Sequence, residues 1–285
     1  MAGPALPDGQ AAVYLPAAMR QRLLESPGAF TEQPMPNLVK TTTPTARAGS
    51  DRFRDEMGDA RLVWDLPLRV FHWLLAGCVV ASWATHELGV EWFAWHVRAG
   101  YLTLVLLAFR IAWGFVGPRH ARFASFVRGP RATLAYLRAL LRGGTPASTG
   151  HNPLGALSVL AMLGLLLLQA VTGLFANDEI FNTGPLYGYV SDAQSDRLAG
   201  LHGRNFDWIV ALIALHLAAV GWYQFRKRVD VIGPMWTGRK PRHEVPEGES
   251  LDGQRLWLAA VLVALAAAAL WRVIATAPPA SMSFF

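Results

Sequence analysis

Cysteine and charge are both scarce in this chain of 285 residues. The single thiol, Cys78, excludes an intramolecular disulfide framework, a cysteine zinc site, a cysteine-ligated iron–sulfur cluster and a haem attached through a Cys-x-x-Cys-His motif. Charged residues make up 16% of the chain, whereas a soluble domain carries about a quarter. No nucleotide-binding glycine-rich loop or flavin fingerprint is visible.

Apolar residues are abundant instead, at 53% of the chain, with a mean hydropathy of +0.26. A disordered chain carries far fewer apolar residues, so the composition favours a polytopic membrane protein. The net charge of +6 and pI near 9.9 would also suit a nucleic-acid-binding protein. The basic residues cluster beside apolar runs, however, which membrane topology explains more simply, and we expect no nucleic-acid partner.

Five apolar segments of about 20 residues are each long enough to cross a hydrocarbon core of about 30 Å as a helix. They cover Leu66–Thr85, Trp95–Phe115, Leu154–Phe175, Phe206–Phe225 and Leu256–Ala275. The sequence therefore predicts an all-α integral membrane protein. Pro67 falls in the first turn of the first helix, where its missing N–H costs little.

The domain boundaries follow from these segments. Residues 1–60 are predicted to form a cytoplasmic tail that is poorly ordered, with a short amphipathic helix at Ala12–Leu24 and no secretory signal peptide. Residues 61–242 form a transmembrane domain of four helices. Residues 243–285 supply a linker and a fifth spanning helix.

Loop charges predict the orientation. The loops after the second and fourth segments are rich in arginine and lysine: Arg119, Arg122, Arg128, Arg131, Arg138, Arg142, Arg226, Lys227, Arg228, Arg239, Lys240, Arg242 and Arg255. By contrast, the other two loops carry the acids Glu87, Glu91, Asp178, Glu179, Asp192 and Asp196, against Arg197 and Arg204. Because basic loops stay in the cytoplasm, we expect a cytoplasmic N-terminus and an external C-terminus.

The segment Pro130–Arg142 in the first basic loop is expected to be a helix, since proline suits its first position. Its arginines alternate with leucines and a tyrosine. It would lie flat on the membrane surface as a basic amphipathic helix, or form a solvated loop helix. The sequence leaves both alternatives open.

Four of the eight histidines lie in or at the mouths of the spanning segments: His72, His96, His202 and His216. An ionisable residue inside a membrane helix is a functional candidate, although a single histidine also serves as a hydrogen-bonding contact between helices. His202 and His216 are 14 residues apart, almost four whole turns, so they share one face and lie roughly 21 Å apart. By topology, His72 lies at the depth of His216, and His96 at the depth of His202.

Two histidine pairs at two depths match the requirement of two haem b groups, each held by one imidazole from either side in a four-helix transmembrane bundle. We therefore predict two haem b groups, with all four histidines as iron ligands. Haem propionates need nearby cations, and the candidates are Arg69, Arg98, Arg110 and Arg204, although each arginine would equally snorkel to the lipid headgroups. Small residues that could admit a porphyrin, or simply another helix, are Gly77, Gly100, Gly164 and Gly173.

His151, at the start of the third helix, is a further candidate for contact with a propionate, a quinone headgroup or a proton path. The alternative is an ordinary polar residue at a helix N-terminus in the interface. His86, His120 and His243 have no evident partner and are expected at the surface.

The residues quoted so far resemble the bacterial cytochrome b561 family, which also takes in the b-type cytochrome subunits of nickel–iron hydrogenases. The matching pieces lie within residues 62–242: Asp65–Trp73, Trp95–Tyr101, His151–Gly155, Thr172–Phe175, Leu201–Gly203 and Leu215–His216. The resemblance implies a dihaem carrier in the bacterial inner membrane, with His72 and His216 on one haem and His96 and His202 on the other. The tail and the fifth helix depart from the simplest members of the family.

The resemblance also implies electron transfer between a quinone, ubiquinone or menaquinone, and a protein redox partner such as a cytochrome c. The main alternative is a membrane-anchoring relay subunit of a hydrogenase-like or dehydrogenase-like complex. A histidine-based metal-ion or proton transporter is a remote alternative, because the apolar parts of the second, third and fifth segments lack carboxylates and no internal repeat is evident. A purely structural membrane protein is equally remote. No catalytic residue is assigned.

Overall fold

The computed structural model describes residues 60–144, 149–177 and 182–279. All of these residues belong to the second of the chain's two units, residues 51–285. The predicted tail helix at Ala12–Leu24 lies outside the described residues.

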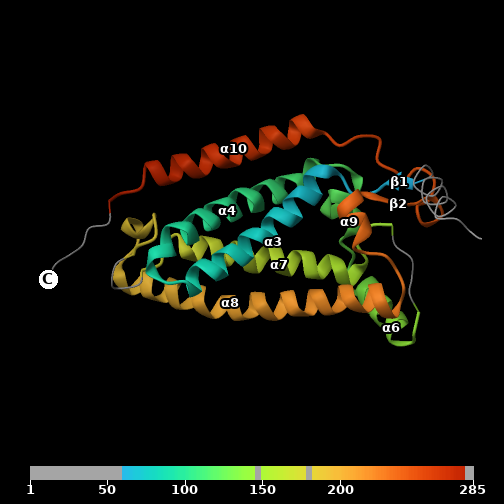
Figure 1. The fold of residues 1–285 in the computed structure, drawn as a ribbon, viewed down its shortest axis with the longest axis horizontal. Coiled ribbons are helices and arrows are strands. Elements are labelled where there is room, and N and C mark those ends of the chain that lie inside the picture. The colour runs from blue at the N-terminus through green and yellow to red at the C-terminus, as the bar shows by residue number, and fades with distance from the viewer. Residues whose placement is uncertain (1–59, 145–148, 178–181, 280–285) are drawn as a thin grey trace, which may run out of the picture. The chain divides into compact units, whose positions relative to one another are not determined.

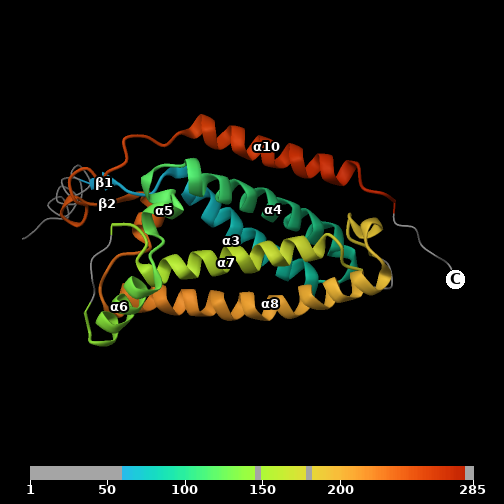
Figure 2. The same ribbon diagram turned by 180° about the vertical axis from the view of Figure 1, so that it is seen from behind.

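Five helices are long and apolar enough to cross a membrane, which confirms the predicted all-helical membrane architecture. They are α3 (Leu66–Glu87), α4 (Phe93–Val116), α7 (Pro153–Gly173), α8 (Asp192–Gly221) and α10 (Leu256–Ala275). Successive helices run in opposite directions along the bundle, as Figures 1 and 2 show.

Helix α4 is central to the packing, because it lies against α3, α7 and α10, while α7 also packs against α8. The buried core beside α4 includes Phe71, Leu106, Phe109 and Trp113. Helix α10 reaches the same core through Ala259, which is small enough to let the two helices approach closely.

The start of α3 is set by Asp65. Its carboxylate accepts hydrogen bonds from the Leu68 amide at 2.9 Å and from the Trp113 indole of α4 at 3.1 Å. The first bond is an N-cap, and Pro67 occupies the first turn as expected. One buried side chain thus begins one helix and fastens it to the next.

Helix α8 is longer than the sequence analysis expects. The apolar run begins at Phe206, but the helix begins at Asp192, after Ser191 and Gln194 form a reciprocal capping box. Hydropathy detects only the apolar part of a helix, so it missed almost four turns at the start of α8. His202 consequently lies well inside α8, and Asp192 and Asp196 belong to the helix rather than to a loop.

The two ends of the bundle differ in charge. At the end that we call the basic end, α4 connects to α7 through η2 (Arg119–Ala121), α5 (Phe123–Phe126) and α6 (Pro130–Leu141). After α8, the same end carries a π-helical turn η4 (Trp222–Arg226), α9 (Gly233–Thr237), β2 (Arg239–Pro241) and η5 (Arg242–Glu244). At the opposite, acidic end lie η1 (Val90–Trp92) and η3 (Tyr187–Tyr189).

A two-stranded antiparallel sheet closes the basic end. Strand β1 (Ala60–Leu62), just before α3, pairs with β2, and Ala60 lies opposite Pro241. Gly238 turns the chain with a φ of 80°, a conformation that glycine adopts readily. Its carbonyl accepts the amides of Val63 and Trp64, so the turn is fixed against the start of α3.

Replacing Asp65 with alanine is expected to lower the free energy of unfolding by about 2–4 kcal/mol, because a helix cap is lost and the buried Trp113 indole loses its acceptor. Asp65→Asn keeps an acceptor oxygen and should lose much less. Thermal or denaturant unfolding of the purified protein in detergent measures both. Equal losses in the two variants would contradict the assigned role.

Candidate haem-binding site

His96 of α4 and His202 of α8 lie beside each other at the acidic end, in an edge-to-face arrangement. Their ring centroids are 6.2 Å apart and the rings are inclined by 68°. Two imidazoles that share a metal ion through bonds of about 2 Å have ring centres roughly 6 Å apart. The spacing therefore fits two axial ligands on opposite sides of one iron.

The orientation of both rings is set by backbone carbonyls. Nδ1 of His96 lies 2.9 Å from the Ser82 oxygen of α3, and Nδ1 of His202 lies 2.9 Å from the Gln169 oxygen of α7. Because a carbonyl only accepts hydrogen bonds, each Nδ1 carries the proton and donates it. Each Nε2 then keeps the lone pair that a metal ion requires.

Polar residues that the sequence analysis missed support His202. The Gln169 side chain accepts a hydrogen bond from Asn205 at 2.7 Å, and Asn205 also donates to the Leu165 carbonyl. A Cβ atom at Gly173 would lie 2.9 Å from the His202 ring. Any residue larger than glycine would therefore push against this ring. The sequence does contain a sign of this support: Gln169 is a polar residue in a long apolar run, and Asn205 follows His202 by three residues.

At the basic end, His72 of α3 and His216 of α8 lie within electrostatic range of each other. Nδ1 of His72 is buried and has no hydrogen-bond partner among the described residues. An orphaned buried imidazole nitrogen is costly unless a ligand or water satisfies it. The structure thus places His96 and His202 in ring contact, and it places His72 and His216 at the same end of the bundle, within electrostatic range.

Among the described helices, those that supply opposing histidines are not packed closely backbone to backbone. Within the described part of the chain, neither α3 nor α4 packs its backbone closely against α8, although each supplies one histidine opposite it. Gly100 lies one turn from His96 on the same face of α4, and a Cβ there would meet no atom within 4 Å. These features fit a porphyrin, and the residues present suit two bis-histidine haems.

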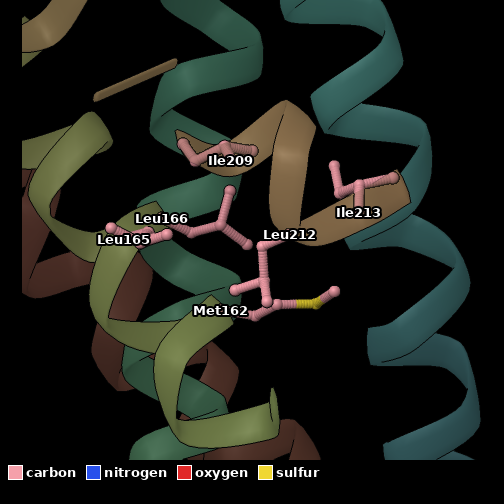
Figure 3. Close-up of a pocket in the computed structure, with 6 residues that line it drawn as sticks. All are labelled: Met162, Leu165, Leu166, Ile209, Leu212 and Ile213. Carbon is pink, nitrogen blue, oxygen red and sulfur yellow. The ribbon is translucent and has the colours of Figure 1, made fainter. Parts of the chain in front are cut away.

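An apolar region separates the two histidine levels. Ile209 is seven residues from both His202 and His216, so it shares their face of α8. It borders a cavity of about 10 Å³ between α7 and α8, lined by Met162, Leu165, Leu166, Ile209, Leu212 and Ile213 (Figure 3). A cavity of this size holds one water at most, and its lining offers that water no polar side chain.

His151 lies beside the basic-end pair. Its ring contacts Trp64 and Phe126, each with a centroid distance of 4.8 Å, and its Nδ1 is buried without a partner among the described residues. Burial, reinforced by the charge of Arg110, lowers the pKa of His151 to about 3. The imidazole is therefore neutral at physiological pH and can accept or donate one hydrogen bond.

Arg110 is the most deeply buried cation in this region, with 2% of its surface exposed. Its guanidinium donates to the Ala121 carbonyl at 3.2 Å and lies over the Phe123 ring. Asp65 supplies a compensating negative field, although burial raises the pKa of that carboxyl. A buried cation at this depth suits an anionic or carbonyl-bearing ligand.

The other predicted propionate contacts are positioned differently. The Arg69 guanidinium donates to the Trp236 carbonyl of α9, and that of Arg98 stacks over the Trp95 ring at 4.6 Å. Arg204 is exposed on α8. At the basic end, Arg69 and Arg110 both stay candidates, because each guanidinium donates to a carbonyl and Nε of Arg69 is buried without a partner among the described residues.

Two of the remaining histidines differ from the expectation. His120 is buried, and its Nε2 lies 2.7 Å from the Glu249 carbonyl; the expected surface position was wrong because the chain after α9 folds back over η2. His86 is exposed as expected, but its ring centroid lies 6.2 Å from that of His96. His243 is exposed, and its Nε2 lies 3.9 Å from Glu244.

The fold and the histidine pairs define a class: a multi-pass helical membrane protein that can hold a metal cofactor between imidazoles of facing helices. The sequence model of the prokaryotic cytochrome b561 family matches residues 63–238, more than half of the chain. The chain belongs to this family. It is a membrane b-type cytochrome that works in electron transfer, and its cofactor is haem b.

Two curated relatives from Azotobacter carry the name "Probable Ni/Fe-hydrogenase B-type cytochrome subunit". The protein of Azotobacter chroococcum mcd 1 is 25% identical over 224 residues, which cover 67% of this chain and 91% of the relative. That of Azotobacter vinelandii is 26% identical over 203 residues, covering 61% of this chain and 76% of the relative. No solved structure matches the chain.

The depressed pKa of His151 predicts a pH dependence of stability. The unfolded chain binds a proton near pH 6.5, but the folded chain binds it only near pH 3. The contribution of His151 to stability is therefore complete above about pH 6.5 and is lost as the pH falls toward 3, by up to about 1.4 kcal/mol per pH unit.

His151→Asn should reduce this acid destabilisation, whereas the same change at the exposed His243 should leave it unaltered. The unfolding midpoint of each protein is measured at several pH values between about 7.5 and about 5, the range in which histidine titrates. The change of the midpoint with pH is then compared between wild type and the two variants. Parallel pH profiles for wild type and His151→Asn would contradict the prediction.

Proposed function

We propose that the protein is a dihaem cytochrome that carries electrons across the membrane between a quinone and a protein redox partner. His72 and His216 hold the haem at the basic end, and His96 and His202 hold the haem at the acidic end. The observation that carries the proposal is the distance of 6.2 Å between the ring centroids of His96 and His202, in which each Nδ1–H donates a hydrogen bond to a backbone carbonyl.

The residues around each iron favour electron transfer over ligand chemistry. Each haem supplies one-electron redox chemistry. Two histidines would hold each iron, and hydrogen bonds to backbone carbonyls orient the rings of His96 and His202. The two histidine levels are roughly 21 Å apart along α8. The residues around Ile209 between these levels are apolar.

We place the protein in the bacterial inner membrane with its basic end in the cytoplasm. Between α4 and α7, the sequence from 117 to 152 contains six arginines and no acidic residue. Such an excess of basic charge marks loops that stay on the cytoplasmic side. The acidic end would then face the periplasm.

A quinone, ubiquinone or menaquinone, would bind at the basic end. Neutral His151 has an unsatisfied buried nitrogen, and Arg110 lies within its electrostatic range. Beside them, the Asn152 amide contacts the Tyr223 hydroxyl at 3.5 Å, and Tyr223 contacts Tyr136 at 3.0 Å. Donors of this kind can hold quinone carbonyls and pass protons to the surface.

Two kinds of redox partner suit the acidic end. The names of the relatives support a role as the membrane-anchoring relay subunit of a hydrogenase-like or dehydrogenase-like complex. The alternative is a soluble cytochrome c with a basic face, which the exposed Asp192 would attract. Co-purification of a catalytic subunit separates the two.

Haem content of single variants tests the ligand pairs. We expect two b-type haems per wild-type chain by pyridine haemochrome assay. His96→Ala and His202→Ala should each remove the same haem, because each iron loses one of two ligands. His72→Ala and His216→Ala should remove the other. A redox titration identifies which component remains.

His243→Ala serves as the matched control and should retain both haems. Loss of the same component in His72→Ala and His202→Ala would overturn the pairing. A folded preparation supplied with haem that binds none would overturn the whole proposal. Failure of an added quinol to reduce a fully loaded protein would remove the quinone assignment alone.

Gly173 tests the fit of the acidic-end site without touching a ligand. A methyl group there pushes against the His202 ring, so Gly173→Ala should weaken haem binding at this level by about tenfold and shift its midpoint potential. Gly164→Ala on the same helix has open space and provides the control. An unchanged acidic-end haem in Gly173→Ala would show that His202 is free to move aside.

A further inference from the structure

Helix α6 supplies none of the paired histidines, although Tyr136 on its inner face belongs to the proposed quinone site. It lies at the basic end, beside the ends of α7 and α8 (Figures 1 and 2). Its position is fixed by two contacts with the chain that follows α8: the Tyr136 hydroxyl meets that of Tyr223 at 3.0 Å, and Lys227 donates to the Gly143 carbonyl at 3.0 Å. Because the apolar part of α8 ends here, α6 lies at the depth where the bilayer core gives way to headgroups.

Three arginines form a stripe along α6. Arg131, Arg138 and Arg142 are spaced seven and four residues apart, so they fall within one narrow face. All three are exposed, and none forms an ion pair with an acidic residue in the described part of the chain. We call this set the arginine stripe.

Exposed leucines flank the arginine stripe on one side. Leu134 is 45% exposed and Leu141 is 77% exposed, and both lie within about a quarter turn of the stripe. The opposite face of α6 carries Tyr136, which is buried against the bundle. The helix therefore presents cationic and apolar side chains together, away from the protein.

We propose that α6 lies in the headgroup layer at the basic end and that the arginine stripe binds the phosphates of anionic phospholipids. The leucines enter the edge of the acyl region while the guanidiniums engage the phosphates. Of the two alternatives that the sequence left open, this is the membrane-surface helix. A lipid surface suits this face better than an acidic protein does, because the leucines border the bilayer that α8 enters.

Native mass spectrometry of the purified full chain in a neutral detergent tests the proposal, with phosphatidylglycerol and phosphatidylcholine added as probes. Wild type should retain phosphatidylglycerol preferentially. The triple variant R131Q/R138Q/R142Q should lose this preference by about tenfold or more. The matched variant R226Q/R239Q/R242Q removes the same charge from the same end and should keep it. Leu141→Ser should weaken retention of both lipids alike.

An equal retention of the two lipids by wild type would overturn the proposal, and it is the result expected if an acidic protein covers this face. An equal loss in both triple variants would also overturn it, since general charge would then explain the preference. Displacement by excess inorganic phosphate would identify a plain anion site instead. The haem spectrum of each variant reports folding, so these outcomes are independent of the quinone and partner assignments.

Discussion

The hydrogen bonds from imidazole to main chain are the contacts on which the site depends. The Nδ1–H groups of His96 and His202 each donate a hydrogen bond to a carbonyl of a neighbouring helix. A carbonyl belongs to the helix backbone and cannot rotate away, so each ring is held more firmly than by a side-chain partner. The bonds also tie α4 to α3 and α8 to α7 at the level of the pair. The same hydrogen bonds therefore orient the two imidazoles and hold the helices together.

The low polarity of the surroundings explains why so few groups are left without partners. In a membrane interior, an unsatisfied polar atom costs more than it does beside water. Among the described residues, the buried orphan side-chain atoms belong to Asp65, Arg69, His72 and His151. All four residues lie at the basic end, in or beside the region where His72 and His216 meet. This concentration is consistent with a region built to receive other polar groups.

The sequence predicted the spanning helices well, because hydropathy measures what the bilayer selects. It predicted α10 to the residue and missed almost four turns at the start of α8, where the capping box at Ser191 rather than apolar character sets the helix start. The histidine pairs followed from helix depth and periodicity, and the structure places His96 and His202 in ring contact. The pairing of His72 with His216 and the role of all four as haem ligands stay predictions. The support from Gln169 and the burial of His120 did not follow, because both depend on contacts between segments distant in sequence.

The pairing of β1 with β2 has a topological consequence. Residues 60 and 241 lie opposite each other, so the chain that enters α3 and the chain that leaves α9 meet at one point. The four spanning helices α3, α4, α7 and α8 therefore make a closed circuit in the chain, and α10 follows it. A chain joined across residues 60 and 241 and reopened in the short turn between α3 and α4 would keep every helix-to-helix contact of that circuit. The packing of the four helices thus does not require that they follow one another in this particular order along the chain.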